Sequence, residues 1–425
     1  MKLPESIFHP QWGITLAAVS ACVLIVASKK ATGGKMFSPW RMLMLSNVGG
    51  IGIYYLGMDS LMSDWAPETW LIWGLALFAY TAGSWASRFV ELPRGASAAA
   101  EHSPDRDRSI LLACSVPYFI AIAGGLATLG TFPVFAKDPE LARGAFAFHA
   151  PWSGWFMGSC MLIFLFGARV LAKGGKGVWA YHLLFWSVVM LQMLTGIRGP
   201  TLFAFFSLAY QWELHRGSVP LFKVATGLLV FLVLFIGIAL LRQGDAIQFT
   251  KNIPMSTIVA VVVGPPYAYV SNNFWNLDHG VREYLIGLGH PTTYGFSLTQ
   301  GIWDIFGSGT DLAKSFGFDT SFNESSAKVR SYNTFNFVWP LFKDGGVVLV
   351  ALFSAAWGFV TELLHRTAVR TPYYAAQILA PYLAFASLFS FFTLYFIIGS
   401  YLVFLAIALV IAMASTTVSR FARKT

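Results

Sequence analysis

Long runs of apolar residues, separated by short polar connections, organise most of this chain. The runs fall at 12–28, 42–58, 69–87, 109–130, 153–172, 178–195, 200–214, 220–241, 345–364, 375–396 and 399–416. A helix needs about 20 apolar residues to cross the hydrocarbon core of a bilayer. The pattern therefore predicts an all-α polytopic membrane protein with about eleven transmembrane helices, in a range of roughly ten to twelve.

One long polar interval, residues 242–344, interrupts this pattern. Long loops in compact proteins usually have a function. Within the interval, residues 256–270 are apolar but too few for a full span, and they include Gly264, Pro265 and Pro266. This composition indicates a re-entrant or interfacial segment. The prediction is a single integral membrane domain over residues 1–425, with 242–344 as its one long loop region.

Composition agrees with this class. Only 12% of the residues are charged and 56% are hydrophobic, whereas soluble domains carry about 25% charged residues. The net charge of +9 is explained by the excess of Lys and Arg in cytoplasmic loops of membrane proteins, so no nucleic-acid partner is expected. The three cysteines lie in apolar runs and indicate neither a disulfide framework nor a metal site.

The basic residues also predict the topology. Alternate short connections and the C-terminal tail hold 18 of the 29 lysines and arginines, namely Lys29, Lys30, Lys35, Arg41, Arg88, Arg94, Arg106, Arg108, Arg169, Lys173, Lys176, Arg216, Lys223, Arg366, Arg370, Arg420, Arg423 and Lys424. Positive charge in short loops marks the cytoplasmic side. The C-terminus is therefore predicted in the cytoplasm, and the N-terminus and the interval 242–344 outside, as an odd number of spans requires.

Four arginines lie on the predicted outer side, although positive charge is usually concentrated on the cytoplasmic side. Arg198 lies in TGIRGP between two apolar runs, Arg242 lies in LRQGD at the end of another, and Arg282 and Arg330 lie within the interval. The planar guanidinium can donate two hydrogen bonds to phosphate and keeps its charge. Several such groups beside the bilayer favour a lipid-linked diphosphate as ligand. For Arg198, a side chain that merely reaches the membrane surface is the alternative.

The interval also contains candidates for acid–base chemistry and sugar contact. His290 and Tyr294 share the stretch GHPTTYGFS, and Asp278 and Glu283 lie within a dozen residues of His290. The interval contains no HExxH, DxD or Cys/His cluster, so no metal or other cofactor is predicted. Aromatic and amide side chains suit sugar binding, and for Trp303 and Trp339 an interfacial aromatic belt is an equal alternative. The amides are Asn272, Asn273, Asn276, Asn323, Asn333 and Asn336.

Three stretches resemble the second half of the O-antigen polymerase (oligosaccharide repeat unit polymerase, Wzy) family. They are SNNFWNLD at 271–278, GHPTTYGFS at 289–297 and SYNTFNFVWPLFKDGG at 331–346. TGIRGP resembles the glycine-flanked arginine of that family, and the resemblance covers residues 190–365. Many members carry an Ile-Pro-Arg-like stretch after the Tyr-Gly turn. This chain has GIWDIFGSG there, which makes Arg330 our candidate for the missing arginine.

The resemblance implies a GT-C-like glycosyltransferase of the bacterial inner membrane. Such an enzyme polymerises undecaprenyl-diphosphate-linked repeat units by block transfer on the outer face of the membrane. Cations must stabilise the diphosphate leaving group, a role that would fall to Arg198, Arg242, Arg282 and Arg330. His290 would be the base for the acceptor hydroxyl, with Glu283, Asp245 and Asp278 as rivals. Tyr294 and Asn333 would contact the substrate.

The partners implied are lipid-linked oligosaccharides, membrane lipid, and a chain-length regulator and a flippase of the same pathway. Two other functions remain open. An O-antigen ligase also has a large outward loop with arginine and histidine. A transporter or flippase for lipid-linked oligosaccharides is expected to bury charges in its spans, and His182 is the clearest ionisable residue inside a run.

Overall fold

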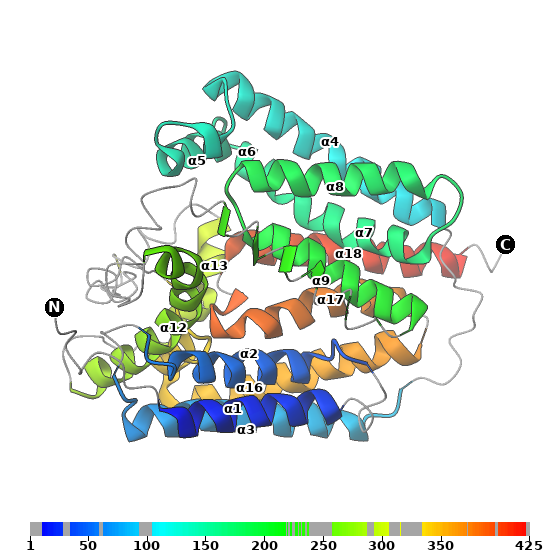
Figure 1. The fold of residues 1–425 in the computed structure, drawn as a ribbon. Coiled ribbons are helices and arrows are strands. Elements are labelled where there is room, and N and C mark those ends of the chain that lie inside the picture. Colours follow the sequence, from blue (N-terminus) through cyan, green and yellow to red (C-terminus); the bar gives the residue numbers. More distant parts are fainter. Residues whose placement is uncertain are drawn as a thin grey trace. The chain divides into compact units, whose positions relative to one another are not determined.

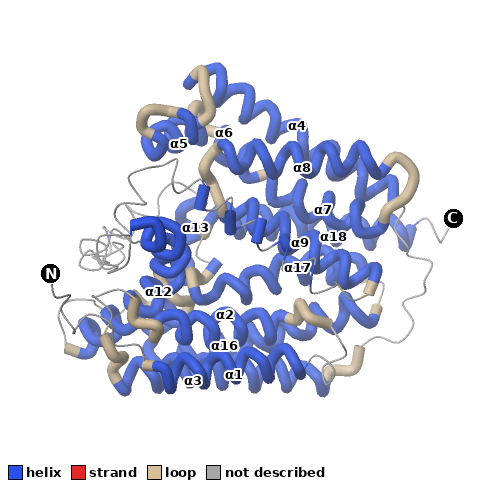
Figure 2. Tube along the Cα trace, in the orientation of Figure 1, coloured by secondary structure: helices blue, strands red, loops and turns tan. Residues whose placement is uncertain are grey.

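The computed structural model describes residues 11–28, 35–58, 63–92, 104–217, 257–286, 293–305, 334–371, 373–395 and 398–421, with isolated positions at 315 and between 219 and 237. Every regular element in these ranges is a helix, as the tube in Figure 2 shows. The all-α prediction is therefore confirmed for the described residues.

The helices follow the apolar runs closely at most positions. In chain order they are α1 (Trp12–Ala27), α2 (Pro39–Tyr54), α3 (Pro67–Ala86), η2 (Ser87–Phe89), α4 (Pro104–Leu129), η4 (Pro133–Phe135), α5 (Pro139–Ala147), α6 (Ser153–Gly158), α7 (Cys160–Lys173), α8 (Val178–Leu194), α9 (Gly199–Arg216), α12 (Thr257–Leu285), α13 (Phe296–Ile305), α16 (Val338–Arg370), α17 (Tyr374–Leu388), η5 (Phe389–Phe391) and α18 (Gly399–Phe421). The run predicted at 153–172 is divided between α6 and α7.

The chain forms two compact units. Unit 1 comprises residues 1–92, 249–364 and 386–403, and unit 2 comprises residues 93–248, 365–385 and 404–425. In Figure 1, α1, α2, α3 and the first part of α16 run side by side in unit 1. The same figure shows α4, α7, α8 and α9 of unit 2 as a second group of long helices.

In unit 1, small residues let helix backbones approach closely. Gly83 of α3 faces the backbone carbonyl of Ala355 in α16, and Gly358 of α16 faces the backbone of Tyr80 in α3. Glycine at such crossings is typical of membrane helices, where tight van der Waals packing replaces the hydrophobic driving force between helices. The Tyr80 hydroxyl lies 2.9 Å from Thr361 Oγ1 and so also links α3 to α16.

In unit 2, α7 is the central helix. All of its residues from Cys160 to Ala172 are buried, and it packs against α4, α6, α8 and α9. A helix that is apolar on every side needs to be enclosed by other helices or by lipid. The Gly167 backbone permits the close approach of the Phe185 ring from α8.

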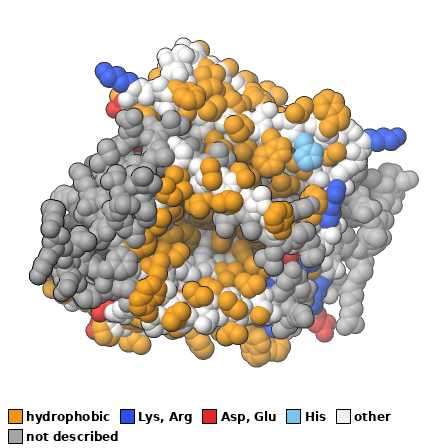
Figure 3. Space-filling model, in the orientation of Figure 1, with side chains coloured by type: hydrophobic (Ala, Val, Ile, Leu, Met, Phe, Trp, Pro, Cys, Tyr) orange, Lys and Arg blue, Asp and Glu red, His pale blue; other side chains and the backbone are white. Residues whose placement is uncertain are grey.

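Large apolar side chains remain exposed along the outer helices. They include Leu24 of α1, Phe78 of α3, Leu183 of α8 and Leu352 of α16, which are 69%, 72%, 61% and 66% exposed. Figure 3 shows hydrophobic side chains over much of the visible face and few charged ones. Apolar surface of this extent marks contact with a membrane or with another protein.

Four helical stretches among the described residues are long and apolar enough to cross a membrane: Asp105–Phe135, Ser153–Lys173, Val338–Arg370 and Tyr374–Phe391. Shorter apolar helices are Trp12–Ala27, Val178–Leu194 and Gly399–Ala414. The chain is thus a membrane-embedded helical protein. The total of eleven spans and the GT-C-like arrangement stay predictions.

The polar interval 242–344 contains two helices in its described parts. Helix α12 runs without a break from Thr257 to Leu285 and includes Pro265 and Pro266. The apolar stretch predicted to be re-entrant is thus the first half of a longer helix. At the end of the interval, Gly345 (φ −159°, ψ 23°) and Gly346 (φ 60°, ψ −156°) interrupt α16 directly after Asp344.

Candidate functional site

The buried carboxylate of Asp278 organises one end of unit 1. It accepts hydrogen bonds from the Ala66 backbone amide at 2.8 Å and from Thr69 Oγ1 at 2.7 Å. Arg282 Nε donates to the other carboxylate oxygen at 2.7 Å. Asp278 therefore fixes the start of α3 against the C-terminal half of α12.

Arg282 is partly engaged in this contact and partly exposed. Its Nη2 donates to the backbone carbonyl of Asp64, and its side chain is 43% exposed. The arginine predicted to bind diphosphate thus lies at a polar helix end, held in place by Asp278. A guanidinium whose orientation is fixed loses less rotational freedom when it binds an anion.

A second pair lies one residue further along α12. His279 Nε2 is 3.0 Å from Glu283 Oε1, and the two side chains are 29% and 17% exposed. The indole ring of Trp275 stacks on the imidazole, with ring centroids 4.6 Å apart and planes inclined by 17°. Glu283, a predicted catalytic residue, is therefore paired with a histidine that the sequence arguments did not select.

The Tyr294 side chain projects from a strained turn that precedes α13. Tyr294 has φ 46° and is 83% exposed. Left-handed backbone costs a non-glycine residue roughly 1–2 kcal/mol and often marks a functional position. Thr293 anchors the turn, because its amide donates to the Lys343 carbonyl at 3.3 Å and its hydroxyl donates to Asp344.

Asp344 fixes the beginning of α13. Its carboxylate accepts hydrogen bonds from the Ser297 amide at 3.1 Å and the Leu298 amide at 2.8 Å. Free amides at a helix N-terminus need such acceptors, and the helix dipole favours a negative charge there. The Asp-Gly-Gly sequence thus has two roles: the aspartate caps α13, and the glycines interrupt α16.

These groups belong to one end of unit 1. Tyr284, after the α12 pairs, contacts the Phe342 ring with centroids 5.1 Å apart, and Phe342 immediately precedes the anchor at Lys343 and Asp344. We call this set the polar end of unit 1; it comprises Asp64, Asp278, His279, Arg282, Glu283, Thr293, Tyr294 and Asp344.

Tyr55 lies beneath the polar end. Its side chain is buried. The Trp65 backbone amide donates to the Tyr55 hydroxyl oxygen at 3.1 Å. This hydrogen bond stabilises the loop before α3.

Several predicted amides have structural contacts. Asn336 Nδ2 donates to Asn47 Oδ1 at 2.9 Å, and Asn47 Nδ2 donates to Ser390 Oγ at 2.7 Å. Asn276 Nδ2 donates to the Thr334 carbonyl at 2.7 Å. Asn47, Asn276, Asn336 and Ser390 are buried, so these side chains connect helices inside unit 1.

Arg198 lies in unit 2, at the N-cap of α9, where it is half-buried. Gly196 has φ 78° just before it. An added Cβ at Gly196 would lie 3.9 Å from Val134 and 4.0 Å from Arg143, so the turn packs against η4 and α5. The predicted grouping of Arg198 with the interval 242–344 remains a prediction.

The other predicted site residues lie outside the described residues. They are Arg242, Asp245, His290, Arg330 and Asn333. Of the predicted set, the structure brings Arg282, Glu283 and Tyr294 to the polar end of unit 1.

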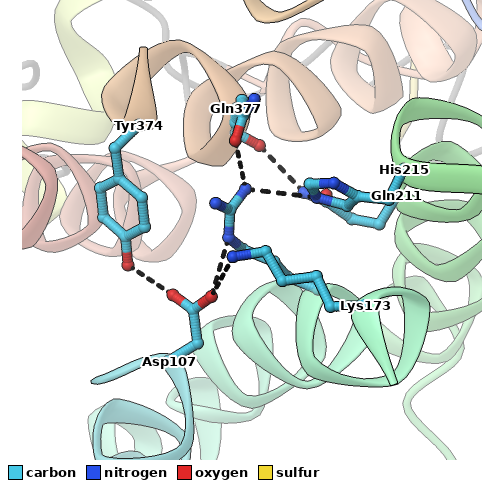
Figure 4. A network of polar contacts seen from close by, with 7 residues as sticks. Asp107, Lys173, Gln211, His215, Tyr374 and Gln377 are labelled. Atoms are coloured by element: carbon cyan, nitrogen blue, oxygen red, sulfur yellow. Dashed lines mark hydrogen bonds and ion pairs between the residues drawn. The ribbon is translucent and has the colours of Figure 1, made fainter. Parts of the chain in front are cut away.

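A buried ionic network occupies one end of unit 2 (Figure 4). Asp107 accepts from Arg169 Nε at 2.9 Å, from Lys173 Nζ at 3.2 Å and from the Tyr374 hydroxyl at 2.8 Å. Arg169 Nη1 continues to Gln377 Oε1 at 2.7 Å. The network is closed by Gln211 and His215, shown in Figure 4. These contacts link side chains from four helices, and we assign the network a structural role that joins α4, α7, α9 and α17.

Two signals for the polar end were available in the sequence. Residues four apart lie on the same face of a helix, so Asp278 with Arg282 and His279 with Glu283 could have been recognised as pairs once α12 was predicted as a helix. The capping role of Asp344 had no such signal, because its amide partners lie 46 and 47 residues away in the chain.

No protein-family model, curated protein or solved structure matches the chain.

Proposed function

We propose that this protein is a membrane glycosyltransferase that polymerises lipid-diphosphate-linked oligosaccharide repeat units into a surface polysaccharide. The observation that carries the proposal is the polar end of unit 1. There, a membrane-embedded helical unit presents a positioned arginine, Arg282, and an exposed aromatic side chain, Tyr294, on an anchored turn.

The physical requirements of the reaction match these groups. Block transfer breaks the bond between the first sugar of the growing chain and the lipid diphosphate. The enzyme must stabilise the negative charge on the departing diphosphate, which positioned cations do effectively. It must also hold a sugar near the membrane surface. The exposed Tyr294 ring offers an apolar face for a sugar.

The sequence resemblance to O-antigen polymerases supports the same reaction. Its stretches include Asp278, Tyr294 and the Asp344–Gly346 turn, all of which belong to or adjoin the polar end. We further propose that this end faces the outside of the bacterial inner membrane. Arg198, Arg242 and Arg330 would add cations for the second lipid-linked substrate, and membrane lipid would surround the apolar helices.

A deletion strain tests the proposal directly through a gel of its surface polysaccharide. A lipid A core that carries one repeat unit is the expected result. A core without repeat units, with polymer accumulating on the lipid carrier, would instead show an O-antigen ligase. Unchanged glycan would reject both enzymes and favour a transporter of another lipid-linked sugar.

Complementation with point variants then tests the polar end. Tyr294→Ala is expected to shorten the polymer at unchanged protein level, because the exposed side chain contributes little to packing. Arg282→Lys is expected to do the same, since lysine keeps the charge but lacks the two-pronged hydrogen bonding of arginine. Tyr373→Ala is the matched control, because Tyr373 is also exposed (44%) but precedes α17. Normal polymer length in both polar-end variants would contradict the placement of the site.

A further inference from the structure

The polar end contains a His279–Glu283 pair that has no role in the substrate binding proposed above. The side chains are one helical turn apart on α12, and the imidazole Nε2 lies 3.0 Å from the carboxylate. The carboxylate lies on the Nε2 side of the ring, so the ring nitrogen turned away from it is Nδ1.

The surroundings hold the imidazole in one orientation. Trp275 stacks on one face of the ring, and the Glu283 carboxylate lies 3.0 Å from its Nε2. The side chain is still 29% exposed, which leaves room for a substrate hydroxyl. A partly exposed histidine held between an aromatic ring and a carboxylate is an arrangement that suits general-base catalysis.

Asp64 is exposed and accepts a hydrogen bond from Gln11 Nε2. Two further carboxylates of the polar end are engaged in contacts between elements of the fold. Asp278 accepts hydrogen bonds from Ala66, Thr69 and Arg282. Asp344 accepts from Thr293, Ser297 and Leu298. Both are buried, so neither is placed to take a proton from a sugar hydroxyl without losing contacts that hold the helices.

We propose that His279 is the catalytic base for the acceptor sugar hydroxyl and that Glu283 is its positioning residue. This inference rests on the proposed function. It replaces His290, which lies outside the described residues, as the first choice for that role. Arg282 follows on the same helix, so the base and a cation for the diphosphate would come from successive turns of α12.

The acceptor hydroxyl oxygen forms a new glycosidic bond with the anomeric carbon of the growing chain. The bond between that carbon and the diphosphate oxygen breaks, and the diphosphate leaves with the bonding electron pair. The hydroxyl proton passes to His279 Nδ1 and from there to water. No metal, oxidant or cofactor is needed.

The test uses full-length protein in lipid nanodiscs. The substrate is the pool of lipid-linked repeat units extracted from the deletion strain, and the rate of glycan elongation is measured against substrate concentration. His279→Gln is expected to lower kcat by about 100- to 10,000-fold, with KM changed less than about threefold because substrate binding uses other groups. Glu283→Gln keeps the shape of the pair and is expected to give a smaller loss of kcat.

Added imidazole supplies a readout that a purely structural histidine would not give. It is expected to restore part of the activity of His279→Ala, whereas His182→Gln, a histidine of α8, is expected to behave as wild type. A His279→Gln enzyme with at least half of the wild-type kcat would overturn the catalytic role while leaving the proposed function intact. Wild-type protein that elongates no glycan would overturn the proposed function itself.

Discussion

At the scale of single residues, Tyr294 and Asp344 have different roles at the start of α13. Tyr294 has a strained left-handed backbone conformation. Its side chain is exposed and contributes little to packing. Asp344 is buried and supplies the hydrogen bonds that hold the turn. Strain at an exposed aromatic residue, sustained by a buried anchor, is typical of a binding position.

The capping role of Asp344 leads to a stability prediction. Asp344→Ala removes the acceptor for two helix amides, and loss of such a cap typically costs about 0.5–2 kcal/mol. We expect faster hydrogen exchange at Ser297 and Leu298 and shorter polymer in complemented cells. Exchange measured by mass spectrometry on protein in nanodiscs would show the change.

Asp138→Ala is the matched control for this variant. Asp138 caps α5 in unit 2 by accepting from the Leu141 amide at 3.1 Å. Its removal is expected to increase exchange in α5 and to leave exchange at the start of α13 unchanged. Unaltered exchange at Ser297 in Asp344→Ala would show that the cap contributes little.

Residue-level prediction from the sequence depended on the chemistry of single side chains. Arg282, Glu283 and Tyr294 were selected by type and by predicted side, and the structure brings them to one end of a unit. His279 was not selected, and Asp278 was considered only as a rival base, because their contacts are with residues four positions away on a helix that was not predicted.

At the scale of elements, uniformly apolar helices were the most predictable. Helices α1, α3 and α8 match the runs predicted at 12–28, 69–87 and 178–195 to within a few residues. Helix α12 was missed because Pro265, Pro266 and its many polar residues break the apolar pattern. Its polar residues instead bond to α3 and to the chain before α16, contacts that a linear pattern does not contain.

The crossing of α3 and α16 provides a prediction at this scale. A Cβ at Gly83 would collide with the Ala355 backbone, and overpacking of a tight contact typically costs about 1–3 kcal/mol. We expect Gly83→Ala to approach the upper end of this range, because backbone cannot move aside as a side chain can. Thermal unfolding in detergent would measure the loss.

Gly74→Ala offers a control in the same helix. An added Cβ at Gly74 meets no atom within 4 Å, and alanine favours a helix over glycine by about 1 kcal/mol. This variant is therefore expected to be as stable as wild type or slightly more stable. Equal unfolding temperatures for the two variants would contradict the close crossing.

At the scale of the whole molecule, the sequence established a membrane-embedded helical protein, and the structure agrees. The side of the membrane that each connection faces is predicted only from the distribution of Lys and Arg. Within unit 2, Asp107, Lys173 and Tyr374 come from connections or helix ends predicted to share the cytoplasmic side, and the structure joins them in one network. Apolar patterning gives no information on how two helical units are arranged, because it reports only which segments leave water.

Reporter fusions test this topology. Alkaline phosphatase, which is active only after export, is expected to be inactive when fused after Asp107 and active when fused after Ile286. A cytoplasmic fluorescent reporter should give the opposite pattern. An active phosphatase at Asp107 would reverse the predicted orientation and would place the polar end of unit 1 in the wrong compartment for transfer on the outer face.

The Asp107 network has a consequence for how the protein is made. The carboxylate of Asp107 and its Tyr374 partner are 267 residues apart, and Gln377 follows later still. During synthesis from the N-terminus, Asp107, Arg169 and Lys173 leave the ribosome long before Tyr374 and Gln377 exist. The growing chain must therefore hold an incomplete ionic cluster until α17 arrives, so the last third of the protein completes the assembly of helices inserted at its beginning.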